Sequence, residues 1–197
     1  MGRLRRRGWN GAGHGPRRLR RDTAAPGAYD LSAEIGNVNA PRLLRPVDGD
    51  FIAQVTVTNA LQPDPGRGSA RRRPFNGAGL LLWQDEKNYV RLEFGAFVEE
   101  KGATVRFALF EHRKNGLPAG GLAQANTRLE ARPTGLRLER RDRTLLGFVR
   151  QGGHDWTPVG QFEVDLPQQL YVGIAAVNTT QAPFAAEFED FNISSRP

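Results

Sequence analysis

The sequence predicts an all-β fold, an antiparallel two-sheet β-sandwich, on three observations. Apolar residues recur at every second position through most of the chain beyond residue 30, which is the period of a strand with one buried face. Turn pairs such as Asp48-Gly49 and Asn115-Gly116 separate these segments, as expected of hairpins. About ten or eleven short strands without an amphipathic helix of useful length are typical of a sandwich or barrel.

The clearest strand covers residues 50–59, where Phe51, Ala53, Val55 and Val57 share one face. Residues 89–94 and 104–112 repeat this alternation, and their predicted core-facing side chains are Val90, Leu92, Phe94, Val105, Phe107 and Leu109. Further strands are predicted at 41–47, 79–83, 127–131, 135–140, 145–151, 159–164, 170–177 and 184–193. Residues 60–76 contain several prolines and three consecutive arginines, so we expect an exposed, mobile loop there.

The basic excess of the chain lies at its N-terminus. Residues 1–22 carry eight arginines and one acid, which accounts for the whole formal charge of +7. A folded nucleic-acid module would carry its basic excess on the fold, so we expect no nucleic-acid partner except through this tail. Its Gly, Arg and Pro composition predicts a disordered segment at 1–25. The sandwich domain is then predicted at 26–197.

The chain has none of the segments that direct a protein into a membrane. The tail arginines are not followed by the apolar run of a secretory signal. No stretch approaches the roughly 18 apolar residues of a membrane span. We therefore expect a soluble protein with no membrane partner, cytoplasmic by default, although the compartment stays open. Because the chain has no cysteine, disulfides and thiolate metal sites are excluded.

Several motifs, in order along the chain, resemble those of concanavalin A-like domains. Residues 76–93, Asn-Gly-Ala-Gly-Leu-Leu-Leu-Trp-Gln-Asp-Glu-Lys-Asn-Tyr-Val-Arg-Leu-Glu, are similar to a hairpin of that superfamily. Residues 153–160, Gly-His-Asp-Trp-Thr-Pro-Val-Gly, resemble its tryptophan turn, and 171–176 and 186–193 resemble its closing strands. The relatives with these motifs are the regulation-of-enolase-type proteins and the C-terminal sandwich of β-xylosidases.

This resemblance covers residues 30–193 and implies a concanavalin A-like jelly roll. It also implies an accessory module associated with carbohydrate, because the best-understood relatives pack beside a glycosidase. The family often begins with a tryptophan-containing strand, and here the arginine-rich tail takes that place. We therefore expect the first strand to be missing or altered, which leaves a sheet edge unpaired.

Catalytic residues are not evident in the sequence. The Glu-x-Asp-x-x-Glu string of laminarinase-like enzymes on this fold is absent, although retaining glycosidases need two closely spaced carboxyl groups. Glu187 and Glu189 share a strand face and leave a glycoside hydrolase as the less favoured alternative. His14, His112 and His154 lack the spacing of a metal site. We expect no enzyme activity, no metal and no cofactor.

One sheet face is the candidate binding surface. With the aliphatic positions turned inward, six side chains are predicted to share the opposite face: Tyr89, Arg91, Glu93, Arg106, Phe110 and Arg137. Aromatic rings beside arginine and carboxylate groups suit sugar rings, so the predicted function is non-catalytic binding of an oligosaccharide or polysaccharide. Two alternatives stay open. These charges can form ordinary cross-strand pairs, or the face can dock a protein partner. Trp83 and Trp156 are expected to pack in the core or in turns.

Overall fold

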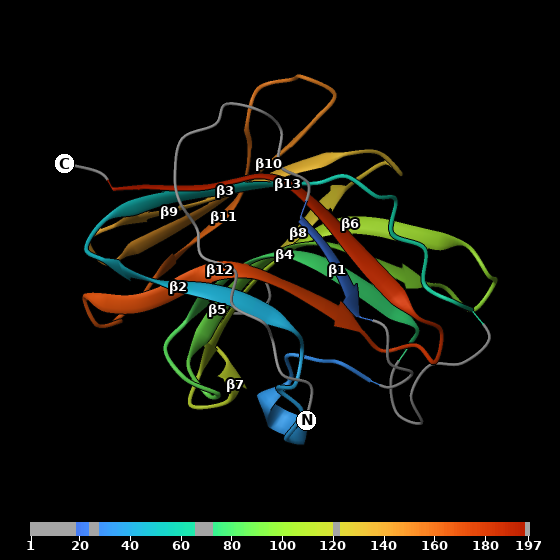
Figure 1. The fold of residues 1–197 in the computed structure, drawn as a ribbon, viewed down its shortest axis with the longest axis horizontal. Helices are drawn as coiled ribbons and strands as arrows, with labels where there is room; N and C mark the ends of the chain where they lie inside the picture. The colour runs from blue at the N-terminus through green and yellow to red at the C-terminus, as the bar shows by residue number, and fades with distance from the viewer. Residues whose placement is uncertain (1–18, 24–27, 66–72, 120–122, 196–197) are drawn as a thin grey trace.

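Two antiparallel sheets form the molecule, and the predicted fold class is confirmed (Figure 1). The structure is a computed structural model and describes residues 19–23, 28–65, 73–119 and 123–195. The six-stranded sheet, sheet A, has the order β1 (Leu19–Thr23), β13 (Phe184–Ser195), β3 (Phe51–Val57), β9 (Thr134–Arg141), β10 (Thr144–Gln151) and β11 (Thr157–Glu163).

The seven-stranded sheet, sheet B, lies against sheet A. Its order is β2 (Arg42–Asp48), β12 (Gln169–Asn178), β4 (Phe75–Trp83), β5 (Tyr89–Val98), β6 (Thr104–Lys114) and β7 (Leu117–Pro118), with β8 (Ala123–Arg128) also paired to β6. The hairpin predicted from residues 76–93 is the pair β4 and β5, in which Gly77 lies opposite Gly95. One 3-10 turn, η1 (Ala33–Ile35), precedes β2.

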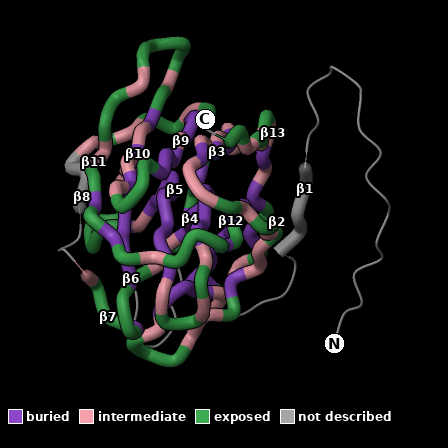
Figure 2. Tube along the Cα trace, turned by 90° about the vertical axis from the view of Figure 1, so that its left-hand side faces the viewer, coloured by how far each residue is buried: buried purple, intermediate pink, exposed green. Residues whose placement is uncertain are grey.

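The main core fills the space between the sheets, where the buried parts of the chain concentrate (Figure 2). The predicted inward faces of β3, β5 and β9 are confirmed, since their apolar side chains all belong to this core: Phe51, Ala53, Val55, Val57, Val90, Leu92, Phe94, Leu136 and Leu138. Burial of such side chains from water is the main force that holds the two sheets together.

The predicted orientation of β6 is wrong. Ala108 and Phe110 belong to the core between the sheets, and Phe110 lies opposite the core residue Leu92. Phe107 therefore faces outward, away from sheet A. The prediction failed because both faces of β6 carry apolar residues, so the alternation alone does not distinguish the inner face from the outer one.

A second apolar cluster covers the outer face of sheet B. Its buried members are Leu31, Ala40, Leu81, Tyr89, Ala175 and Val177. Leu31 and Ala40 come from residues 28–41, which we call the covering segment; Ala33 and Val38 of the same segment pack against the cluster. A bridge between Tyr29 and Asn178 joins the segment to β12. Sheet B is consequently buried on both faces at this position.

The N-terminal region differs from its prediction. Residues 19–23, assigned to the disordered tail, form β1 and pair with β13 from Leu19 opposite Phe188 to Thr23 opposite Phe184. The sheet edge expected to lack a partner is thus paired, and sheet A begins before the predicted domain boundary at 26. Residues 1–18 lie outside the described part of the chain.

Two further predicted segments are shifted. The predicted strand 127–131 corresponds to β8, which covers Ala123–Arg128. Of the predicted loop 60–76, residues 66–72 are outside the described ranges, and Leu61 and Pro63 are buried instead of exposed. Within the described residues, no helix has the length and apolar character needed to cross a bilayer.

Candidate functional site

The six predicted site residues do not share one surface. Tyr89, Arg91 and Glu93 lie on the outer face of sheet B, as predicted, but all three are buried. Arg106 and Phe110 lie on the inner face of β6, because they alternate with Phe107. Arg137 belongs to β9 in the other sheet. The predicted common face is therefore wrong, and only its β5 part remains as a site.

The residues on the inner face of β6 have structural partners. Phe110 is fully buried and its ring centroid lies 4.6 Å from that of Phe162. The Arg106 guanidinium donates from Nε to the carbonyl of Leu61 at 2.9 Å. These contacts fasten the loop after β3 and β11 to sheet B. They leave neither side chain on the outer face.

Tyr89 anchors the covering segment. Its hydroxyl donates to the Leu31 carbonyl at 2.9 Å, and its ring stacks on Trp83 with centroids 5.5 Å apart. Burial raises the pKa of the Tyr89 hydroxyl to about 12, because the phenolate loses its solvation. The guanidinium of Arg42 lies 4.0 Å from the centre of the Trp83 ring. Both tryptophan and tyrosine are thereby used in packing at this end of the sheet.

Next to Tyr89 lies a buried ionic cluster, made of Arg91, Glu93, Glu111 and Arg113. Arg91 Nη2 donates to Glu111 Oε2 at 2.9 Å, and Arg113 Nε donates to Glu111 Oε1. Arg113 Nη1 also donates to Glu34 of η1 at 2.7 Å. Burial would raise the pKa of Glu111, but Arg91 and Arg113 outweigh it and hold the pKa below its usual value. Glu111 is thus the fully bonded carboxylate of the cluster.

Glu93 is bonded differently from Glu111. The carboxylate is 1% exposed, and its nearest ionic contact is Arg91 Nη1 at 3.7 Å from Oε2. Burial raises the pKa of Glu93 to about 7, Arg91 opposes the shift, and the charges of Glu111 and Asp30 add to it. Both carboxylate oxygens lack a hydrogen-bond partner among the described residues.

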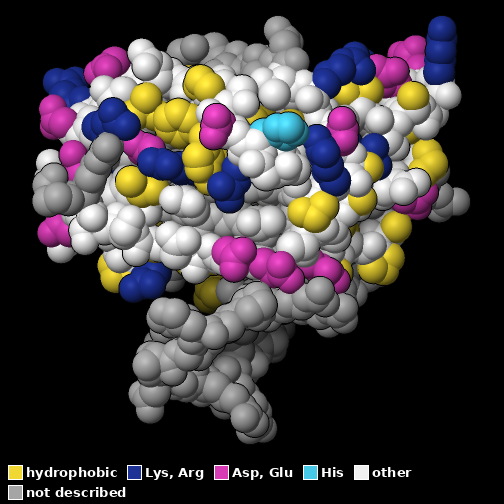
Figure 3. Space-filling model, turned by 90° about the horizontal axis from the view of Figure 1, so that it is seen from above, with side chains coloured by type: hydrophobic (Ala, Val, Ile, Leu, Met, Phe, Trp, Pro, Cys, Tyr) yellow, Lys and Arg dark blue, Asp and Glu magenta, His cyan; other side chains and the backbone are white. Residues whose placement is uncertain are grey.

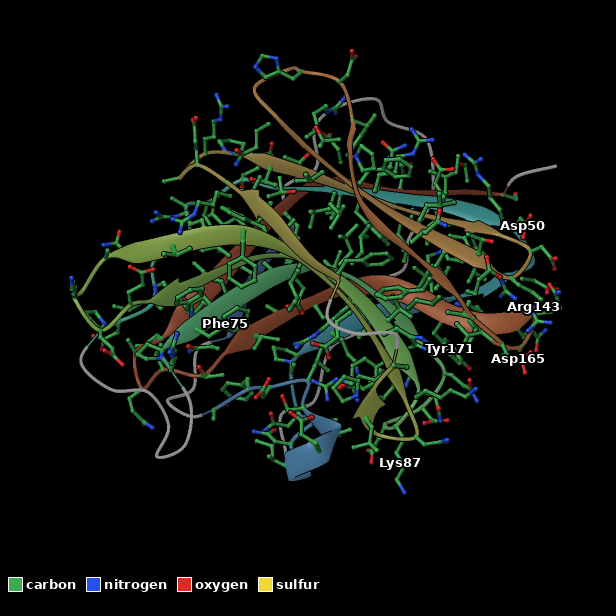
Figure 4. All side chains as sticks on the ribbon, turned by 180° about the vertical axis from the view of Figure 1, so that it is seen from behind. Asp50, Phe75, Lys87, Arg143, Asp165 and Tyr171 are labelled. Atoms are coloured by element: carbon green, nitrogen blue, oxygen red, sulfur yellow. The ribbon has the colours of Figure 1, made fainter. Side chains whose placement is uncertain are left out.

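A cluster of phenyl rings borders Glu93. The Phe97 and Phe107 centroids are 5.6 Å apart, and those of Phe75 and Phe107 are 6.3 Å apart. We call these three residues the aromatic patch. All three side chains are only partly buried, and Phe75 lies at the open end of the β4–β5 hairpin, whose turn carries Lys87 (Figure 4).

Two paired glycines connect the patch to the carboxylate. A Cβ on Gly77 would lie 2.8 Å from Glu93 Oε2 and 2.9 Å from the Phe75 ring. A Cβ on Gly95 would lie 3.1 Å from Phe75 and 3.3 Å from Phe107. Only residues without a side chain let the Phe75 ring lie this close to the sheet. The Phe75 ring and the Glu93 carboxylate therefore both lie against the backbone of Gly77.

Sequence reasoning missed most of the aromatic patch. Phe107 was assigned to the core because the orientation of β6 was inverted, and Phe75 lies in the segment predicted to be a loop. Gly95 and Phe97 lie between the two predicted strands 89–94 and 104–112, so neither was assigned to a strand. The useful signal is the cluster of phenylalanines around Gly77 and Gly95, since a glycine within a strand often marks a close approach.

The outer face of sheet A is more open. Arg137 pairs with Glu139, and its guanidinium lies 5.7 Å from the Phe148 ring and 5.9 Å from the Trp156 ring. Arg150 lies closer to Trp156, at 4.5 Å. Trp156 thus packs in a turn region, on Gly135. Seen from above, the molecule carries basic, acidic and apolar side chains interspersed (Figure 3).

The acids of the hydrolase alternative lie on this sheet. Ala186 and Phe188 face the core, so Glu187 and Glu189 face outward from β13. Glu187 Cα is paired with Arg20 of β1. Among the described residues, His, Asp and Glu side chains do not form a group of three suited to a metal ion.

Comparison with solved structures identifies similar folds. A functionally unknown protein from Saccharomyces cerevisiae has a TM-score of 0.68 and 15% identity, with 91% of this chain and 89% of that chain covered. The GH43 BlXynB protein from Bacillus licheniformis has a TM-score of 0.62 and 17% identity, covering 91% of this chain and 33% of that chain. Xylan β-1,4-xylosidase from Bacillus halodurans C-125 has a TM-score of 0.59 and 16% identity, covering 89% and 32%.

These similarities concern the fold. The chain corresponds to about a third of the length of the two Bacillus proteins. A search of curated protein sequences gave no match. Residues 29–196 match a family model described as "Protein of unknown function (DUF1349)".

Proposed function

This chain belongs to the DUF1349 family of proteins of unknown function, and we propose that its sandwich is a non-catalytic module that binds a neutral oligosaccharide or polysaccharide. Within the jelly-roll superfamily, we also propose that it is similar in type to the regulation-of-enolase proteins and the C-terminal sandwich of β-xylosidases. The aromatic patch on the outer face of sheet B is the observation that carries the proposal.

The patch has the chemistry of a sugar platform. Phe75, Phe97 and Phe107 are partly exposed on one face, and a pyranose ring can stack its C–H groups on such rings. Phe107 lies between the other two in the ring cluster, so it is the central contact. The Arg73 guanidinium lies 5.9 Å from the centre of the Phe97 ring, and the buried Glu93 carboxylate lies near Phe75. Such groups supply the donors and acceptors that sugar hydroxyls need.

The structural relatives support the same proposal. One is a xylan β-1,4-xylosidase, and the matched sandwich is about a third of it. A domain of this size beside a glycosidase is suited to an accessory role. Xylo-oligosaccharides are consequently the first ligands to test.

The test is binding of xylohexaose by isothermal titration calorimetry. We expect Phe107→Ala and Phe97→Ala to weaken binding by roughly 2- to 12-fold each, the equivalent of about 0.5–1.5 kcal/mol per aromatic contact. Phe148→Ala is the matched control, because Phe148 is a partly buried phenylalanine on the outer face of sheet A. Circular dichroism checks that each variant is folded.

Three results would count against the proposal. Wild-type protein that binds neither xylohexaose nor cellohexaose, laminarihexaose or chitohexaose overturns it. Binding that is weakened by Phe148→Ala but not by Phe97→Ala or Phe107→Ala assigns the site to the other sheet. Turnover of xylan by the protein, abolished by Glu187→Gln, would replace it with the hydrolase alternative.

A protein-interaction function is the second candidate, and two exposed apolar side chains favour it. Ile35 of η1 is 56% exposed and Leu117 of β7 is 62% exposed. Their elements are neighbours, because a Cβ on Gly116 would lie 3.6 Å from Ala33 Cβ. If this surface docks a protein, Ile35→Ser with Leu117→Ser should abolish co-purification of that partner. Xylohexaose binding should be unchanged.

A further inference from the structure

Four buried polar atoms of Arg91 and Glu93 have no hydrogen-bond partner among the described residues, although Arg91 Nη1 and Glu93 Oε2 form an ion pair at 3.7 Å. Glu93 Oε1 and Oε2 and Arg91 Nε and Nη1 are inaccessible to solvent and make no hydrogen bond within the described structure. Nη2 of the same guanidinium bonds Glu111, so Arg91 is fixed in place. Buried polar groups of native proteins nearly always have a partner. Four such atoms on two adjacent side chains therefore indicate a missing one.

The number and type of these atoms define the missing group. The carboxylate offers two acceptor oxygens, and the guanidinium offers two unbonded donor nitrogens. A metal cation would satisfy Glu93 and leave the arginine donors without acceptors. A secondary amide has one donor and one acceptor, so it would leave one oxygen of Glu93 and one nitrogen of Arg91 without a hydrogen bond. Two adjacent hydroxyls supply two donors and two acceptors, and match both side chains.

The Phe75 ring lies next to this position. The ring lies over the Gly77–Gly95 pair, and both the ring and Glu93 Oε2 lie close to Gly77. The backbone of Phe75 is fastened to Thr179, whose hydroxyl accepts from Phe75 N at 3.0 Å. The side chain is partly exposed, and the proposal below requires its ring to turn toward solvent while the strand stays in place.

We propose that Glu93 and Arg91 form a polar subsite that binds a vicinal diol of a neutral pyranoside, whose ring stacks on Phe97 and Phe107 after Phe75 turns aside. This inference rests on the proposed function and deepens it by naming the hydroxyl pair that is recognised. A site built to bond a hydroxyl rejects an analogue that lacks it, because its own polar groups are then left unbonded.

The experiment is a protein-observed NMR titration with methyl β-D-xylopyranoside and its 2-deoxy, 3-deoxy and 4-deoxy analogues. We expect wild-type protein to bind the parent at least 10-fold more tightly than the deoxy analogues that break the recognised diol. Glu93→Gln should lower affinity for the parent by about 10-fold and remove this discrimination. Glu139→Gln is the matched control: Glu139 is also a 1% exposed glutamate, but lies on sheet A between Arg137 and Arg141. It should keep the wild-type pattern.

The outcomes separate the two proposals. Parent and deoxy analogues that bind wild type equally, while Phe107→Ala still weakens xylohexaose binding, overturn the diol subsite and leave the proposed function standing. Absence of all sugar binding overturns both. A crystal structure of wild type with the pyranoside gives a second test that needs no variant. Sugar oxygens bonded to Glu93 and Arg91, with Phe75 rotated, support the subsite; ordered water at those atoms, with the sugar elsewhere, overturns it.

Discussion

Three buried glutamates of this sandwich show how neighbours decide the behaviour of one side-chain type. Burial disfavours the charged form of each. At Glu139 this is outweighed by hydrogen bonds and charge from Arg141 and Arg137, which lower its pKa. At Glu111 the arginines Arg91 and Arg113 do the same. Glu93 has only a 3.7 Å contact with Arg91, so burial prevails and its pKa rises to about 7.

The raised pKa of Glu93 predicts a pH dependence of stability. The folded carboxyl, with its pKa of about 7, keeps its proton at pH values where an unfolded one, with its pKa of 4.5, has lost it. Its contribution to the free energy of unfolding is therefore complete below pH 4.5 and is lost as the pH rises to about 7. Urea denaturation from pH 4.5 to 7.5 should show wild type losing stability relative to Glu93→Gln, which has no proton to release.

The comparison with Glu93→Gln isolates this group from its surroundings. The charged groups that act on Glu93, namely Arg91, Glu111 and Asp30, are present in both proteins. Burial and Lys114 lower the pKa of His112, which gives a stability change of opposite sign near pH 6.5, but this change cancels in the difference. A difference between the two proteins that stays constant across the range would contradict the assigned pKa of Glu93.

At the scale of elements, the covering segment converts a sheet face into a second interior. Leu31 is fully buried against Tyr89 and Leu81, and Arg113 bonds Glu34 in the middle of the same segment. The segment thus does not cover the part of sheet B that carries Phe75, Phe97 and Phe107. The aromatic patch is what remains of the face once the segment is in place.

The bond between Tyr89 and Leu31 is expected to hold this segment down. Tyr89→Phe removes the hydroxyl and leaves the buried Leu31 carbonyl without its side-chain donor, which should lower the free energy of unfolding by about 1–2 kcal/mol. Amide exchange should accelerate at residues 28–41, as measured by hydrogen-exchange mass spectrometry. Tyr171→Phe is the control: Tyr171 is 51% exposed on β12, so its loss should change stability little. Equal effects of both variants would show that the hydrogen bond does not fasten the segment.

The strands were predictable from the sequence to the extent that one of their faces is polar. In β3 and β9 apolar residues alternate with Gln54, Thr56, Arg137 and Glu139, so their core faces follow directly. β6 has Phe107 and Leu109 on one face and Ala108 and Phe110 on the other, because its outer face also packs against aromatic rings. Short pairings such as β7, with two residues, have too little sequence to show a period.

At the scale of the whole molecule, the order of the strands in the two sheets decides which side chains can form a site. This order cannot be predicted from the residue pattern within any single strand. β9 has the same alternation as β5, yet it lies in the opposite sheet, which separates Arg137 from Arg91. Burial depends on the covering segment, which lies some 50 residues before Arg91 in the sequence. The sequence correctly placed Tyr89, Arg91 and Glu93 of β5 on one face. It could not show that Arg106, Phe110 and Arg137 lie on other faces.

The N-terminal region gives the last prediction, which combines charge with topology. Residues 1–18 hold six arginines and no acid, so deleting them lowers the formal charge from +7 to +1 and leaves β1 intact. Any DNA binding through this tail should then disappear. In the full chain, the affinity for DNA should fall by up to about a thousandfold between 50 and 200 mM salt. Fluorescence anisotropy with a DNA duplex measures the effect of the deletion and the effect of salt. Deletion of residues 1–23 also removes β1 and exposes the edge of β13, so we expect a lower melting temperature and aggregation only in this longer deletion. DNA binding that survives deletion of 1–18 would move the basic site onto the sandwich itself, where the remaining arginines are balanced by acids.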